Sequence, residues 1–112
     1  MDAHEHMQRA LAELLTLSCI NEEASFSYYI SKLINARTEG AIHIPASCII
    51  PHLYHLLENG QIKEIQREIN GRIRTCYAIT PAGQERLADL IQAYMDTHQA
   101  FLVFLEKQKQ AQ

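Results

Sequence analysis

The chain contains no tryptophan, and its 112 residues include only three cysteines. Without tryptophan, no ligand pocket can be built from stacked indole rings. Cys19, Cys48 and Cys76 are odd in number and far apart, so we expect reduced thiols and a cytoplasmic location rather than a disulfide framework. No apolar run approaches the roughly 20 residues that cross a membrane. The polar and acidic residues 1–6 do not resemble a signal peptide, so we expect none.

An overall excess of positive charge is also missing, since the net charge is -3 at pH 7. Residues 1–60 hold three basic against seven acidic side chains, and residues 78–112 hold three against four. Only residues 61–77 are basic, because Lys63, Arg67, Arg72 and Arg74 outnumber two glutamates there. A local concentration of charge decides the field that a phosphate meets. This segment predicts either a DNA contact or a hairpin kept soluble by its charges.

Recognisable catalytic patterns are absent. The sequence has no glycine-rich phosphate loop, nucleophile elbow or paired catalytic carboxylates, which predicts a protein that is not an enzyme and uses no cofactor. Cys48, His52 and His55 are spaced to share one helical face, so a metal site is a minor alternative to our prediction of none. Cys48, near a helix N-terminus, could instead sense oxidation, although such a residue more often simply fills space between helices.

Apolar residues at helical spacing predict three helices before residue 60. The first runs from about Glu5 to Ile20, and the second from Phe26 to about Arg37. The third has Ser47 as its N-cap and Pro51 in its first turn, and it ends at Asn59-Gly60.

A β-hairpin follows, formed by residues 61–68 and 72–79. Asn70-Gly71 is the dipeptide that best accepts positive φ at both central positions of a two-residue turn. Arg72 and Arg74 are two residues apart, so their side chains lie on one face of the strand. Three helices and a two-stranded wing, in this order, predict a mainly α winged helix-turn-helix.

The last helix is predicted from Pro81 to about Lys107, after Thr80 as N-cap, and would be about 40 Å long. A winged-helix core cannot cover so long an apolar stripe, which predicts a homodimer. The alternative folds the stripe back onto the chain's own first helix. The expected interface residues are Leu11, Leu14, Leu15, Ile91, Tyr94, Met95, Phe101, Leu102, Phe104 and Leu105. Residues 1–80 would be the winged helix-turn-helix DNA-binding domain and 81–112 the dimerisation helix, with residues 107–112 frayed.

Two segments resemble the PadR family of bacterial transcriptional regulators. Gly71-Arg-Ile-Arg-Thr-Cys-Tyr-Ala-Ile-Thr-Pro-Ala-Gly83 resembles the family's wing pattern Gly-Arg-Pro-Arg-x-x-Tyr-x-Leu-Thr-x-x-Gly. Pro51-His-Leu-Tyr-His-Leu-Leu-Glu-Asn-Gly-Gln-Ile62 resembles its recognition-helix pattern Pro-x-Leu-x-x-Leu-x-x-x-Gly-x-Ile. The chain departs from the family at Phe26-Ser27, where His-Gly is usual, at Ile50, where tyrosine is usual, and at Ile73, where proline is usual.

The resemblance implies a dimeric transcriptional repressor that binds double-stranded DNA. It also implies that a small aromatic effector releases the repressor from the DNA. By analogy with helix-turn-helix docking, the third helix enters the major groove and the wing contacts phosphates. The expected DNA-binding residues are Lys32, Ser47, Cys48, His52, Tyr54, His55, Lys63, Arg67, Arg72 and Arg74. The acidic total and the lack of arginine on the third helix leave an alternative, a winged-helix module that binds another protein and has lost DNA binding.

Overall fold

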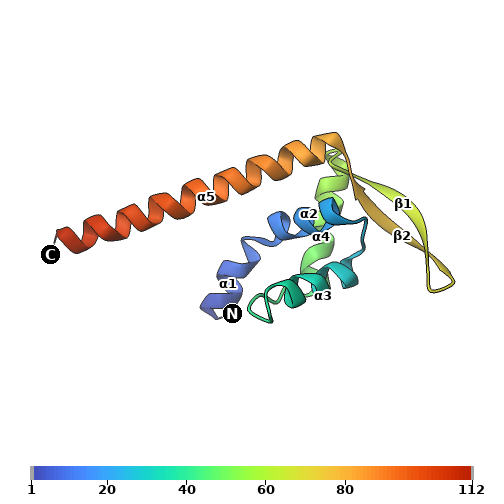
Figure 1. Ribbon diagram of the computed structural model, residues 1–112, viewed down its shortest axis with the longest axis horizontal. Helices are drawn as coiled ribbons and strands as arrows, with labels where there is room; N and C mark the ends of the chain where they lie inside the picture. The colour runs from blue at the N-terminus through green and yellow to red at the C-terminus, as the bar shows by residue number, and fades with distance from the viewer. Residues whose placement is uncertain (1, 112) are drawn as a thin grey trace.

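The computed structural model describes residues 2–111 of the chain. In this range the elements are α1 (Ala3–Arg9), α2 (Ala12–Glu22), α3 (Ser27–Arg37), α4 (Ala46–Glu58), β1 (Ile62–Ile69), β2 (Arg72–Ile79) and α5 (Pro81–Gln110). The β1–β2 hairpin projects from the body formed by α2, α3 and α4, and α5 extends away from the body in the other direction (Figure 1). The predicted mainly helical winged helix-turn-helix with a long C-terminal helix is confirmed.

The hydrophobic core lies between α2, α3 and α4 and is closed by the first turns of α5. Its buried apolar side chains recur three or four residues apart on each helix, as an amphipathic helix requires. They are Leu17, Ile20, Ile30, Ile34, Ile44, Ile49, Leu53, Leu56, Ile62 and Leu87. Each such side chain stabilises the fold by about 1.5–3 kcal/mol. In the described range, no helix has the length and apolarity of a membrane span.

The hairpin forms with the predicted turn. Ile69 pairs with Arg72, which leaves Asn70 and Gly71 as a two-residue loop with φ of 52° and 78°. These positive values are those of a type I′ turn, whose twist matches that of the two strands. At its base β2 also pairs with Ser25, because the amide of each of Ser25 and Tyr77 donates to the carbonyl of the other at 3.0 and 2.8 Å. The wing is therefore attached to the body by backbone hydrogen bonds.

A close approach between α5 and the end of α4 fixes where α5 leaves the body. The Thr80 hydroxyl accepts from the Gly83 amide at 3.1 Å and donates to the Gly60 carbonyl at 2.7 Å, while the Thr80 amide donates to the Gln61 carbonyl at 3.1 Å. A Cβ on Gly83 would lie only 2.0 Å from that Gln61 oxygen. Glycine is therefore required there by contact with the backbone.

The prediction of one continuous helix from Glu5 to Ile20 is wrong, because α1 ends at Arg9 and α2 begins at Ala12. The break lets α1 lie against the segment that leads into α4. There the Gln8 Nε2 donates to the Ala41 carbonyl at 2.9 Å, and the Gln8 Oε1 accepts from the His43 amide at 3.1 Å. A long-range contact of this kind leaves no trace in the helical periodicity.

The predicted start of the third helix is also wrong. Helix α4 begins at Ala46 with Pro45 as N-cap, so Ser47 lies inside the helix rather than capping it. Pro51 is consequently the sixth helical residue and not part of the first turn. Because proline has no N–H, the Ser47 carbonyl loses its usual partner four residues on. Pro51 is exposed, so this gap lies on the solvent side of the helix.

Helix α5 is longer than predicted. The sequence predicts fraying from Lys107 onward, whereas α5 continues to Gln110 and the Ala111 amide still donates to the Lys107 carbonyl at 3.1 Å. Lys107 and Lys109 lie in the last turn, where positive charge is favourable to the helix dipole. Gln112, the last residue of the predicted fraying segment, lies outside the described residues.

Candidate nucleic-acid interface

Helix α4 presents one polar face to solvent. Ser47, Tyr54 and His55 are exposed there, and Tyr54 retains 63% of its accessible surface. Two other residues predicted for this face, Cys48 and His52, are partly buried, and Cys48 packs against the core. The five predicted contact residues of this helix therefore divide into three that solvent reaches freely and two on the flank of the helix.

An ion pair joins α2 to α5. Arg86 Nε donates to Glu13 Oε2 at 2.8 Å, and Arg86 NH2 donates to Glu13 Oε1 at 3.2 Å. This hydrogen bonding lowers the pKa of the Glu13 carboxyl below 4.5 against the opposing effect of burial, and the nearby His52 and His55 add smaller contributions. The Glu13 carboxylate therefore anchors α5 to the body through Arg86.

The wing carries its arginines on a single face. Arg72, Arg74 and Arg67 share it, because Arg67 is the direct cross-strand partner of Arg74. Arg72 and Arg74 are exposed, and within residues 2–111 neither forms an ion pair. Arg67 is engaged by the body, since its NH1 donates to Glu23 Oε1 at 3.1 Å and to the Ala24 carbonyl at 3.0 Å. The two arginines nearest the tip thus remain accessible to an anion.

Two lysines complete the predicted set. Lys63 is exposed at the base of the wing, opposite Ala78. Lys32 is exposed on α3, and its Nζ lies 5.3 Å from the centre of the Tyr28 ring. Between α4 and the wing is a hollow of about 230 Å³, with Tyr54 among its lining residues. Exposed cations are therefore present on α3 and on the wing, and both of these elements pack beside α4.

The minor alternatives raised by the cysteines and histidines find no geometric support. Among residues 2–111, no three side chains of histidine, cysteine, aspartate or glutamate come together as a metal site would require. Burial raises the pKa of the Cys19 thiol to about 11, and Cys76 is fully buried. Cys48 is the most accessible thiol of the three, but it packs against the core as a small apolar residue does.

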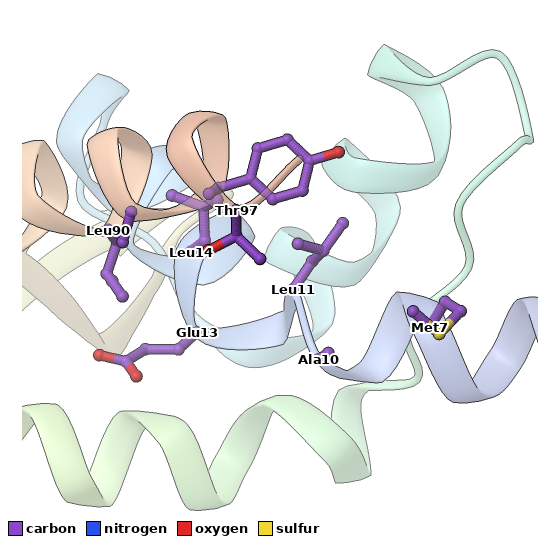
Figure 2. A pocket seen from close by; sticks show the side chains of 9 residues that line it. Met7, Ala10, Leu11, Glu13, Leu14, Leu90 and Thr97 are labelled. Atoms are coloured by element: carbon purple, nitrogen blue, oxygen red, sulfur yellow. The ribbon is translucent and has the colours of Figure 1, made fainter. Parts of the chain in front are cut away.

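A second, apolar surface runs along α5. Every residue from 91 to 111 is exposed, and the large apolar side chains there are Ile91, Tyr94, Met95, Phe101, Leu102, Val103, Phe104 and Leu105. Where α5 passes α1 and α2, the elements enclose a groove of about 440 Å³ lined by residues that include Met7, Leu11, Leu14, Leu90 and Tyr94 (Figure 2). Leu14 and Leu90 also pack against the core, as does Leu15, another residue predicted for the interface. The body covers the first turns of α5 and leaves the rest open.

A comparison with protein families identifies the family of this winged-helix protein. Residues 16–89, more than half of the chain, match the transcriptional regulator PadR-like family. The chain belongs to this family. PadR-like proteins are transcriptional regulators and not enzymes. The match spans α3, α4 and the wing, the elements that carry the exposed cations described above. No curated protein sequence matches this PadR-like chain.

Solved structures share the fold over nearly the whole chain. A transcriptional regulator from Clostridium thermocellum is 26% identical, with a TM-score of 0.76 over 90% of this chain and 94% of that one. A PadR-like transcriptional regulator from Bacillus cereus is 23% identical, with a TM-score of 0.75 over 89% of this chain and 96% of that one. A PadR family regulator from Clostridium difficile is 20% identical, with a TM-score of 0.71 over 85% and 98%. The shared fold therefore extends over 85–90% of this chain.

Sequence reasoning missed the residues of the body that hold the wing of this PadR-like protein. Glu23 binds Arg67, and the Phe26 ring lies 5.0 Å from the guanidinium carbon of Arg74. In the sequence Glu23 is one of two adjacent glutamates that end a helix, and Phe26 reads as the first apolar residue of the next helix. Only the register of the hairpin reveals these contacts, so no local pattern could have indicated them.

Proposed function

We propose that this PadR-like regulator is a cytoplasmic, dimeric repressor that binds double-stranded DNA through α4 and the wing. The observation that carries the proposal is the exposed pair Arg72 and Arg74 at the tip of a hairpin beside the solvent face of α4. A guanidinium group holds a phosphate with two parallel hydrogen bonds, which makes such a pair suited to a DNA backbone. Family membership supports the same conclusion.

In this proposal the wing supplies phosphate contacts and α4 enters the major groove. Arg72 and Arg74 hold the backbone, supported by Lys63 and Lys32, and Tyr54 contacts sugar or phosphate. The remaining predicted α4 contacts, Ser47, Cys48, His52 and His55, offer no bidentate reading of guanine or adenine, which arginine, lysine, asparagine or glutamine provides. Affinity then depends mainly on charge and shape, and binding should be strongly sensitive to salt.

Fluorescence anisotropy with the duplex upstream of the protein's own gene tests the DNA contact. If each subunit neutralises two or three phosphates, log K falls against log salt with a slope of about -4 to -5 for the dimer. Arg72→Ala combined with Arg74→Ala should abolish most of the binding. The matched control is Lys107→Ala with Lys109→Ala, which removes two charges from the far end of α5. Binding that does not depend on salt concentration would contradict the proposal. So would a control variant that loses as much affinity as the arginine variant.

Dimerisation would proceed through α5. The apolar residues of its outer half form two stripes at helical spacing: one contains Ile91, Met95 and Leu102, and the other continues from the groove through Phe101 and Phe104. Exposed apolar area on two sides of one helix is best covered by a second chain that packs against α5. The exposure of both stripes is the observation that supports a dimer over folding back.

Analytical ultracentrifugation tests the dimer. Phe101→Glu with Phe104→Glu places two charges in the proposed interface and should yield monomers at micromolar concentration. Gln99→Glu with Gln110→Glu makes the same change of charge on the polar side of α5 and should leave the dimer intact. A wild-type protein that sediments as a monomer would refute this part of the proposal, as would a double phenylalanine variant that remains dimeric.

We further propose that a small aromatic effector releases the regulator from DNA. The groove between α5 and the α1–α2 pair is predominantly apolar, and its volume of about 440 Å³ suits a drug-sized ring system. Planar aromatic compounds should bind there and weaken DNA binding in the anisotropy assay. Leu90→Glu, which introduces a charge into the groove, should remove that response while leaving DNA binding measurable.

One observation favours the alternative of a protein-binding module. The solvent face of α4 bears no arginine or lysine and ends in the exposed Glu58, which repels phosphate. The anisotropy experiment separates the two functions. Absence of binding at low salt, where electrostatic affinity is greatest, would favour the protein-binding module.

A further inference from the structure

The four residues that connect α2 to α3 each contact the wing. Glu23 and the Ala24 carbonyl receive hydrogen bonds from Arg67, Ser25 pairs with Tyr77 through two backbone hydrogen bonds, and the Phe26 ring lies under Arg74. In contrast, the wing residues from Gln66 to Thr75 are exposed except for Arg67 and Ile69. This connection, residues 23–26, therefore contacts the side of the wing and supports the part of the hairpin beyond its base.

The register of the hairpin explains why such support is needed. Arg67 and Arg74 are direct cross-strand partners on the same face. Like charges in this position repel each other and destabilise the pair of strands. The body supplies a different partner for each, since Glu23 offers an anion to Arg67 and Phe26 offers the face of a ring to Arg74. The hairpin is therefore more stable docked on residues 23–26 than free.

We propose that Glu23 and Phe26 are positioning residues that fix the orientation of the wing relative to α3 and α4, and so set where Arg72 and Arg74 meet DNA. This inference rests on the proposed function. It gives Arg67 the role of an internal anchor, because its NH1 is already shared between two acceptors of the body. The same connection leads directly into α3, so the wing and the helix-turn-helix move as one unit.

For one substitution, electrostatics alone predicts a different outcome from the loss of positioning. Glu23→Gln removes a negative charge near the DNA, and electrostatics would then raise affinity for every duplex equally. Positioning predicts instead that the wing becomes mobile and that discrimination between duplexes falls. Phe26→Leu changes no charge and keeps an apolar side chain, so its effect on discrimination arises from the lost ring contact with Arg74.

The experiment compares Glu23→Gln and Phe26→Leu with the wild-type dimer. Its matched control is Glu22→Gln, because Glu22 is the adjacent carboxylate and pairs with Arg37 of α3 rather than with the wing. Anisotropy measures affinity for the duplex upstream of the gene and for a scrambled duplex of equal length. Amide hydrogen exchange of residues 66–75 reports wing mobility without DNA.

Both variants should lower the ratio of specific to scrambled affinity by about three- to fivefold, the range of an exposed ion pair or cation–π contact. Both should also accelerate amide exchange in the wing, while Glu22→Gln changes neither. Unchanged wing exchange, or equal tightening on both duplexes in Glu23→Gln, would overturn the inference. If the wild type binds neither duplex, the proposed function fails, and the exchange data alone then decide whether residues 23–26 hold the wing.

Discussion

Replacing Gly83 by alanine is expected to destabilise the protein, although alanine is normally preferred in helices. At an unconstrained helical position this substitution stabilises by about 0.5–1 kcal/mol. At Gly83 the new Cβ would lie 2.0 Å from the Gln61 carbonyl oxygen and 2.7 Å from Ile79 Cγ1. The oxygen belongs to the backbone, so no rotation of a side chain can relieve the contact. Steric exclusion therefore predicts a loss of stability, whereas helix propensity predicts a gain.

The size of this loss of stability follows from the atoms that the new methyl group must displace. Forcing an extra methyl into a packed contact costs about 1–3 kcal/mol. Displacing the start of α5 also weakens two hydrogen bonds, from the Thr80 amide to Gln61 and from the Gly83 amide to the Thr80 hydroxyl. Each contributes about 0.5–1.5 kcal/mol. After the gain in propensity is subtracted, we expect a loss of about 2–4 kcal/mol in the free energy of unfolding.

Urea unfolding followed by circular dichroism measures this loss. All variants are compared at one protein concentration, because the stability of a dimer depends on concentration. The reference variant is Ala88→Gly, an exposed position on α5 that should lose about 1 kcal/mol from helix propensity alone. A Gly83→Ala protein with an unchanged or higher urea midpoint would refute the steric reasoning.

Three further expectations concern the ion pair, the thiols and the DNA. Because Arg86 lowers the pKa of Glu13 in the folded protein, the carboxylate stabilises the fold above its unfolded-state pKa and ceases to do so as the pH falls through the folded value. Glu13→Gln should therefore reduce stability at pH 7, by about 0.5 kcal/mol for a partly exposed pair, and a difference that persists in strong acid in the urea titration would contradict this. In Ellman titration of the folded protein Cys48 should react first, with Cys19 and Cys76 reacting only after unfolding, and fast reaction of all three thiols would contradict their burial. Inserting five base pairs between half-sites should weaken binding by about tenfold or more, because it turns one half-site to the opposite side of the duplex, and an anisotropy titration with unchanged affinity would exclude a rigid dimer.

The sequence predicts those parts of the fold that local chemistry determines. Asn70-Gly71 specifies a two-residue turn, because few other dipeptides accept positive φ at both positions. Thr80-Pro81 specifies the start of α5, because a hydroxyl can cap the helix and proline needs no partner there. Apolar spacing identifies α3, α4 and α5 for the same reason. These features depend on residues close together in the chain, and the structure confirms them.

What the sequence could not predict depends on contacts between distant residues. The break between α1 and α2 accompanies the binding of Gln8 to residues 41–43, more than 30 positions away. The prediction of Arg67 as a DNA contact depends on its being free, whereas Glu23 engages it across 44 positions. The sequence pattern shows that a charge is present at this position but not which group the charge contacts. Whether that charge meets the body or a phosphate depends on the register and the docking of the wing.

The distribution of charge explains why geometry should dominate recognition in the proposed regulator. Residues 1–60 carry a net charge of -4, from three basic and seven acidic side chains, so the net charge of the helical body provides no overall attraction to DNA. Attraction then comes mainly from the wing, and contacts to phosphate position a protein without reading sequence. Discrimination between duplexes must therefore arise from where the two wings are held. Residues 23–26 set the orientation of each wing, and the unbroken helix α5, from Pro81 to Gln110, would set the distance between the two in a dimer. A substitution that loosens either element should impair specificity before it impairs affinity, whereas removing a phosphate contact such as Arg72 should weaken binding to every duplex about equally.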